Sequence, residues 1–285
     1  MFLRVAFYSA GARALKYGLY LPNFAAFGDP RALLELAELA ERAGWDGFFL
    51  WDHIARPGSP PVVDPWIALA GIAVATERLR IGALVTPLAR RRPWKVARET
   101  VSLDRLSRGR LVFGAGLGSS GGEQSEWAAF GEELDLPKRA ELLDEGLAIL
   151  AGLWSGRPFS HSGAHFQVSE SRFLPTAVQT PRIPVWVAGY WPAKRPLRRA
   201  AAWDGLYALF RDGPPADVEQ LAEAVAYVRA HRAPEAGPFD VIYNSHSRRG
   251  PEAYARAGAT WWLAHVRPDE SLESARSLIS AGPPR

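Results

Sequence analysis

Short apolar segments alternate with longer amphipathic ones from residue 16 to the end of the 285-residue chain, and this alternation limits the fold more than any other feature. The apolar segments have strand length and end at polar, Gly or Pro residues, whereas the segments between them keep helical spacing. Strands are predicted over 16–22, 47–51, 81–85, 111–115, 184–189, 206–210, 239–243 and 261–266, each followed by a predicted helix. Eight such units predict an α/β protein with a closed (β/α)8 TIM barrel.

The alternation is interrupted at two places, and only the N-terminal one bounds the predicted domain. Residues 155–182 are rich in Pro, Gly and aromatic residues and predict an excursion of loops or short strands after the helix that follows the fourth strand. Residues 1–15 are typical of a loosely ordered N-terminal extension, so 16–285 form the single predicted domain. An open doubly wound sheet is the alternative, but no strand is followed by G-x-G-x-x-G with an acidic residue about 20 positions later.

The composition narrows the class of partner. The chain has no cysteine, which excludes disulfides, thiolate metal sites and a cysteine nucleophile and fits a reducing, cytoplasmic location. Its net charge of +4 is carried mostly by scattered arginines, so nucleic acid is not an expected partner. No apolar run has the length needed to span a bilayer. Neither nucleic acid nor a membrane is therefore an expected partner.

The carboxyl ends of the predicted strands are where a barrel binds its ligands, so the residues there are the site candidates. His53 is a candidate acid–base residue because imidazole titrates near neutral pH, although a structural hydrogen bond in a surface loop would explain it equally well. Glu126 lies beyond a Gly/Ser loop that could carry its carboxylate over the barrel mouth, or it could cap a helix. The full set is Asn23, Asp52, His53, Thr86, Gly116 to Gly122, Gly189 to Trp191, Arg211, Asn244 to His246 and Arg267.

Three segments could bind an anion. The glycines from Gly116 to Gly122 could let backbone N–H groups approach one. Gly189 precedes a helix whose N-terminus could hold a phosphate. Ordinary βα turns explain both glycine segments as well. The basic loop at 90–92 could meet the anionic tail of a cofactor, or it could simply be solvated.

A metal site is the less favoured reading of the strand ends. Asp52 and His53, together with His246 or His265, could ligate a metal in a hydrolase of the barrel type. Many such enzymes carry an H-x-H pair at the end of the first strand, where Asn23 stands here. No metal ligand is therefore predicted.

Several short segments, in order from about residue 16 to 210, resemble the bacterial-luciferase-like flavin- and F420-dependent oxidoreductases. The similar segments are KYGLYLPN (16–23), AGWDG (43–47), WDH (51–53), TERLRIG (76–82), VTP (85–87), LDRLSRGRL (103–111), QTPRIPVWVAG (179–189) and RAAAWDG (199–205). The ordered set is far more specific than any one of these segments.

The resemblance implies a TIM barrel with the ring of FMN or coenzyme F420 packed over the third strand. By position, the non-prolyl cis peptide bond of the family falls at Ala83–Leu84. Asp52 and His53 match the pair that contacts the deazaflavin and handles a proton, and Glu126 falls near a family carboxylate. The remaining residues implied in cofactor binding are Ala83, Leu84, Thr86 at the ring edge, Gly116, and Gly189, Tyr190 and Trp191 in the turn near the cofactor phosphate.

The function that follows is a flavin-type oxidoreductase acting on a small organic substrate. It is either a reduced-FMN-dependent monooxygenase or an F420-dependent hydride-transfer enzyme, with His53 as the acid–base residue. A non-catalytic flavin-binding barrel protein and a metal-dependent TIM-barrel hydrolase are the alternatives. Relatives are often dimers, so a homodimer is also expected. The tryptophans that could exclude water from the ring, or belong to the core, are Trp51, Trp66, Trp94 and Trp191.

Overall fold

A computed structural model of the chain describes residues 14–118, 125–210, 218–245 and 250–284. Residues 1–13 of the predicted N-terminal extension lie outside these ranges, as do residues 119–122 of the glycine segment, Arg211 and His246 among the site candidates. Within them, no helix is both long and apolar enough to cross a membrane.

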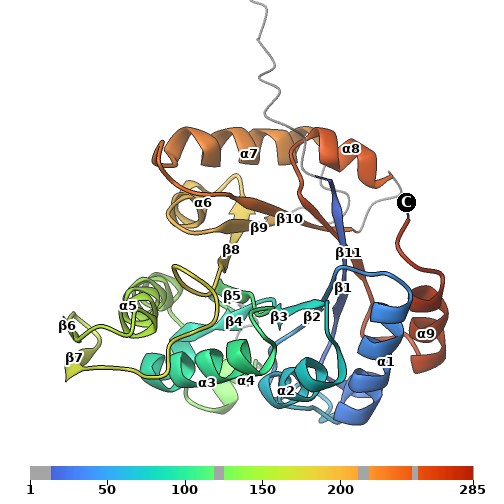
Figure 1. Ribbon diagram of the computed structural model, residues 1–285, viewed down its shortest axis with the longest axis horizontal. Coiled ribbons are helices and arrows are strands. Elements are labelled where there is room, and N and C mark those ends of the chain that lie inside the picture. The colour runs from blue at the N-terminus through green and yellow to red at the C-terminus, as the bar shows by residue number, and fades with distance from the viewer. Residues whose placement is uncertain (1–13, 119–124, 211–217, 246–249, 285) are drawn as a thin grey trace, which may run out of the picture.

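A nearly closed ring of parallel strands forms the centre of the molecule, and helices surround it on all sides (Figure 1). The order of the strands around the ring is β3-β2-β1-β11-β10-β9-β8-β5-β4. Since β3 and β4 are two pieces of the third barrel strand, the ends of this order meet, and a bridge from Ile81 to Leu111 helps to close it. The strands are β1 (Lys16–Leu21), β2 (Gly47–Leu50), β3 (Arg80–Ala83), β4 (Thr86–Pro87), β5 (Phe113–Gly116), β8 (Val185–Trp191), β9 (Gly205–Phe210), β10 (Asp240–Ser245) and β11 (Trp261–His265). The predicted (β/α)8 fold is confirmed.

A helix follows each barrel strand, as the alternation predicts. Asp29 caps the first helix by accepting a hydrogen bond from the Arg31 N–H, and Pro30 occupies the first turn as its sequence signal indicates. The helices are α1 (Pro30–Arg42), α2 (Pro65–Ala75), α3 (Pro93–Leu106), the short α4 (Glu126–Ala129), α5 (Leu136–Trp154), α6 (Lys194–Ala201), α7 (Val218–His231), α8 (Pro251–Arg256) and α9 (Leu272–Ser280), with 3-10 turns η1 (Ala25–Phe27) and η2 (Leu88–Arg90).

Large side chains fill the inside of the barrel below its mouth, the end at which the strands finish. Trp186 packs against Phe49 and Trp261, with ring centroids 5.3 Å apart in both pairs. Leu84 and Tyr207 belong to the same buried interior cluster. Because the interior is filled, a ligand can reach the barrel only at its mouth.

The predicted excursion is an antiparallel hairpin outside the barrel, made of β6 (Phe159–Ser162) and β7 (Gln167–Ser171). Figure 1 shows it beside α5. Glu145 of α5 accepts hydrogen bonds from the backbone N–H groups of Ala164, His165 and Phe166, which hold the turn of the hairpin on the helix.

The third strand differs from its prediction. It stops at Ala83, two residues early, and resumes at Thr86. The non-prolyl cis bond joins Leu84 to Val85, so its expected position at Ala83–Leu84 is wrong by one residue. The Leu84 N–H still donates to the Leu50 carbonyl at 2.8 Å, so the chain keeps its register with β2 through Leu84 and departs from it only afterwards.

The fifth barrel strand, β8, is longer than predicted. Gly189, Tyr190 and Trp191 pair with residues of β9 as far as Phe210, so they lie in a strand and the expectation of a turn at these residues is wrong. Continued pairing with β9 keeps this backbone extended, and the strand ends only before Pro192.

Candidate active site

A buried asparagine at the end of β1 positions the segment that follows β2. The Asn23 amide donates to the carbonyl oxygens of His53, at 2.8 Å, and Val63, at 2.7 Å. Its own oxygen accepts from the His53 N–H at 3.2 Å. Asn23 is therefore a positioning residue of the barrel mouth, because it fixes the backbone of His53 through two hydrogen bonds.

His53 and Glu126, the two predicted catalytic residues, are in direct contact. His53 Nδ1 lies 3.0 Å from Glu126 Oε1, although the residues are 73 positions apart. The other carboxylate oxygen accepts from the backbone N–H groups of Ile54, at 2.8 Å, and Ala55, at 3.2 Å. Because an ionised carboxylate only accepts hydrogen bonds, Nδ1 of His53 is the donor in this contact, and Nε2 is the acceptor whenever the ring is neutral.

Two arginines that follow the third strand complete this site. Arg90 donates to Glu126 Oε1 at 2.7 Å, to Asp52 Oδ1 at 2.9 Å and to the Asp52 carbonyl at 2.6 Å. Arg91 donates to both carboxylate oxygens of Asp52, at 2.8 and 2.9 Å. We call Asp52, His53, Arg90, Arg91 and Glu126 the charged cluster. Its two carboxylates and two guanidinium groups balance when His53 is neutral.

The electrostatics of the charged cluster keep Glu126 ionised. Burial alone would raise its pKa, but the hydrogen bond to His53 and the charge of Arg90 lower the pKa of Glu126 to about 2. The side chain is only 5% exposed. Glu126 is therefore a constant negative charge beside His53.

The charged cluster corrects two interpretations of the sequence. Arg90 and Arg91 bind carboxylates of their own chain, so they do not form a basic loop open to an anionic tail. Both oxygens of Asp52 accept hydrogen bonds from arginine, so they are not available to bind a metal ion. Among the described residues, no group of three or more His, Asp or Glu side chains is arranged to hold a metal ion.

Aromatic side chains connect His53 to the third strand. The ring of Trp51 lies 5.8 Å from that of His53 and 5.6 Å from that of Tyr20. The Tyr20 hydroxyl donates to the Leu84 carbonyl at 2.7 Å. Burial raises the pKa of Tyr20 well above its ordinary value, so this hydroxyl stays protonated. The charged cluster and the interrupted third strand therefore lie at the same end of the barrel.

The opposite wall of the mouth carries polar groups from β9, β10 and β11. The Asn244 amide donates to the Tyr207 hydroxyl at 3.3 Å and lies 3.2 Å from His265 Nδ1. His265 packs edge-on against Trp51, with ring centroids 5.7 Å apart. The candidate Arg267 lies outside this wall, where it is exposed and paired with Asp269.

The third strand and β5 contain the other predicted cofactor-binding residues. Thr86 is fully buried, and its hydroxyl oxygen has no hydrogen-bond partner among the described residues. Ala83 packs between the sheet and the helices, whereas Leu84 packs inside the barrel. Gly116 leaves room for the Val85 side chain, which a Cβ at this position would strike.

The predicted phosphate segment forms a separate part of the mouth. Gly189 is buried, and a Cβ there would lie 2.9 Å from Leu206. Tyr190 is 46% exposed. The Lys194 ammonium lies 3.7 Å from the centre of the Trp191 ring. No contact that the structure describes joins these residues to His53 or Glu126.

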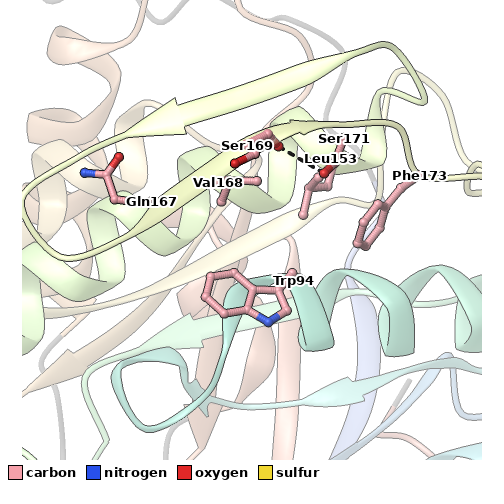
Figure 2. Close-up of a pocket in the computed structure, with 7 residues that line it drawn as sticks. All are labelled: Trp94, Leu153, Gln167, Val168, Ser169, Ser171 and Phe173. Carbon is pink, nitrogen blue, oxygen red and sulfur yellow. Dashed lines mark hydrogen bonds between the residues drawn. The ribbon is translucent and has the colours of Figure 1, made fainter.

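Two tryptophans that were candidates for walls of the site lie elsewhere. Trp66 packs against Phe113, and Trp94 lines a hollow outside the barrel, between α3, Leu153 of α5 and the hairpin strand β7 (Figure 2). Periodicity does not distinguish these positions, since any apolar face of a barrel helix can turn toward the sheet or toward a neighbouring element. Of the four candidates, Trp51 lies beside the charged cluster.

Comparisons with known proteins agree with the fold. The family model for luciferase-like monooxygenases matches residues 7–280. The F420-dependent glucose-6-phosphate dehydrogenase of Microbacterium testaceum is 30% identical over 188 residues, which cover 63% of this chain. The aligned part spans about half of that relative's length, 52%.

Solved structures show the shared fold at lower identity. An F420-dependent secondary alcohol dehydrogenase in complex with an F420–acetone adduct matches with a TM-score of 0.74 at 16% identity, covering 94% of this chain and 97% of the other. The monooxygenase RslO1 from Streptomyces bottropensis matches with a TM-score of 0.67 at 23% identity, covering 86% of this chain and 75% of the other.

Proposed function

The chain belongs to the luciferase-like monooxygenase family, and we propose that it is an F420-dependent oxidoreductase that transfers a hydride between the deazaflavin and a small organic substrate. The observation that carries the proposal is the contact of His53 with the buried Glu126, at the same barrel mouth as the interrupted third strand. An acid–base residue is needed there because a carbon that loses a hydride also loses a proton from its oxygen.

The residues of the mouth fit a flat tricyclic ring. The buried Thr86 hydroxyl has an unused capacity for a hydrogen bond to a ring edge. Tyr20 and Trp51 provide aromatic surface beside the third strand, and Gly189 to Trp191 are the residues that would hold the tail of the cofactor. F420, when bound, supplies the two-electron chemistry that amino-acid side chains lack.

The protein's own groups would handle the proton. Nε2 of neutral His53 accepts a proton from the substrate hydroxyl, and the Glu126 carboxylate at Nδ1 stabilises the imidazolium that results. Asn23 holds the His53 backbone in place while the ring changes charge. Trp51 and Phe24 pack against the imidazole and shield it from water.

A reduced-FMN-dependent monooxygenase is the second candidate. The match to the luciferase-like monooxygenase family over almost the whole chain favours it. The curated relative at 30% identity, which is F420-dependent, favours the first candidate instead. The acid–base pair supports hydride transfer more directly, because it provides the proton acceptor that oxidation of an alcohol needs.

The test is a titration of the purified protein with F420 and, separately, with FMN, followed by fluorescence. The protein with bound oxidised F420 is then mixed with each of a panel of alcohols and sugar phosphates, and the loss of the visible absorbance of F420 is recorded. We expect F420 to bind more tightly and to be reduced by at least one member of the panel. Binding of FMN alone, with substrate-dependent oxygen consumption, would support the second candidate. Failure of both cofactors to bind would refute both candidates.

A further inference from the structure

Arg90 lies just after the third strand and contacts the acid–base pair, although it is not among the predicted catalytic or cofactor-binding residues. It is the last residue of η2, only three positions after Pro87 ends β4. Its guanidinium contacts Glu126 and Asp52 together, while its side chain is only 3% exposed. A guanidinium group presents its N–H donors in one rigid plane, so it can bind two carboxylates in a fixed geometry. An ammonium group lacks this rigid arrangement of donors.

The geometry makes Arg90 and His53 share one oxygen atom. Glu126 Oε1 accepts from Arg90 Nη1 at 2.7 Å and from His53 Nδ1 at 3.0 Å. Because the guanidinium is always protonated, it holds this oxygen as an acceptor. The proton of neutral His53 is thereby confined to Nδ1, and Nε2 remains the atom that accepts a proton.

The charges around His53 also indicate that Arg90 favours the neutral form of the imidazole. The carboxylates near it are Glu126 on α4 and Asp52 beside it, and the cations are Arg90, Arg91 and Arg56, which packs on the Phe24 ring. The other titratable groups nearby are His265 and Tyr20, which both pack on the Trp51 ring. Removal of the Arg90 charge would leave the charged cluster with a net negative charge, which favours the imidazolium.

We propose that Arg90 is a positioning residue that keeps His53 neutral with its acceptor nitrogen free, so that the oxidoreductase proposed above has a general base at neutral pH. The catalytic meaning of this role rests on the proposed function. The effect on His53 itself does not, because it can be measured in the protein without any cofactor.

The experiment is an NMR titration of the His53 imidazole in the full chain, with the signal assigned by its loss in His53→Gln. We expect Arg90→Gln to raise the protonation midpoint of His53 by about one pH unit or more. Arg91→Gln, which removes a partner of Asp52 only, should cause a smaller rise. Arg92→Gln is the matched control, since Arg92 is an exposed neighbour that stacks near Trp94, and it should leave the midpoint unchanged.

Two further variants separate charge from geometry. Arg90→Lys keeps the charge but loses the fork, so the midpoint should stay near that of the wild type while kcat falls about tenfold and KM changes less. In the double variant Arg90→Gln/Glu126→Gln, the rise in midpoint over Glu126→Gln alone should be clearly smaller than the rise that Arg90→Gln causes in the wild type, because Arg90 acts mainly through Glu126. This variant also avoids leaving a buried unpaired Glu126 if Arg90→Gln does not fold.

The results that would overturn the proposal are equally specific. If the midpoint in folded Arg90→Gln matches that of Arg92→Gln, Arg90 does not control His53. An additive shift in the double variant would show that Arg90 acts independently of Glu126. Failure of F420 to bind any of these proteins would instead count against the proposed function and leave the titration result intact.

Discussion

At the scale of single residues, the activity should depend on His53, because its imidazole is placed at the barrel mouth to exchange a proton with a substrate. We expect His53→Ala to lower kcat by about 100-fold or more, since the general base is lost. Cofactor affinity should change little, because the third strand and Thr86, which would hold the cofactor ring, remain in place. Steady-state kinetics and fluorescence titration measure the two quantities, and unchanged turnover would remove His53 from the mechanism.

Glu126 should make the stability of the protein depend on pH in acid. Its pKa is lowered from 4.5 to about 2 in the folded protein, so its stabilising effect is complete above the unfolded value and is lost as pH falls through the folded value. The free energy of unfolding of the wild type should therefore fall by about 2 kcal/mol more than that of Glu126→Gln as pH falls from 4.5 to 2. Urea unfolding at several pH values measures this, and parallel curves for the two proteins would contradict it.

Thr86 should show opposite effects on stability and on binding. Thr86→Val keeps the shape and removes a buried hydroxyl that has no partner among the described residues, so the free energy of unfolding should rise by about 1 kcal/mol. Cofactor affinity should fall if the hydroxyl bonds the ring edge. Thr100→Val is the control, because the Thr100 hydroxyl is bonded to Val96 and Trp154 and its loss should only destabilise.

At the scale of elements, the seam between the third strand and β5 depends on glycine. A Cβ on Gly82 would collide with the backbone carbonyl oxygen of Val112, which cannot rotate away. Gly82→Ala should therefore lower the free energy of unfolding by about 1–3 kcal/mol. Gly237→Ala is the control, since nothing lies within 4 Å of its Cβ position. Equal stability of the two variants would show that the seam adjusts at little cost.

At the scale of the whole molecule, α2 presents an uncharged, partly apolar face to solvent. None of its 11 residues is charged, and Ile67 and Val74, 69% and 71% exposed, lie two turns apart on its outer face. Groups near a two-fold axis meet their own copies, so a face without charge avoids repulsion there. We propose that the expected homodimer forms through this face.

The dimer proposal is tested by light scattering during size-exclusion chromatography. We expect the wild type to be a dimer and Ile67→Glu/Val74→Glu to be a monomer, because the new carboxylates would face each other across the axis. Leu278→Glu, which changes an exposed apolar residue on α9, should remain a dimer. A monomeric wild type, or a double variant that stays dimeric, would contradict the proposal.

The tertiary structure decided which side chains meet at the mouth. Arg90 and Arg91 bind groups 36 to 39 positions away, and His53 binds one 73 positions away. Such partners depend on how three loops fold back over one end of the barrel. The periodicity of the sequence carries no information about such long-range contacts. The sequence of the basic loop at 90–92 therefore does not indicate that Arg90 and Arg91 form ion pairs with carboxylates of the same chain. The position of the cis bond depends in the same way on where pairing with β2 stops.

The sequence by itself determined the barrel, the excursion, and the strand ends that carry Asp52, His53 and Thr86. Alternating apolar strands and amphipathic helices are local patterns, because each strand or helix must bury its own apolar face. The contact of His53 with Glu126 and the control of both by Arg90 were decided only by tertiary structure. The physical reason is that ion pairs form between groups that are close in space, whatever their separation along the chain.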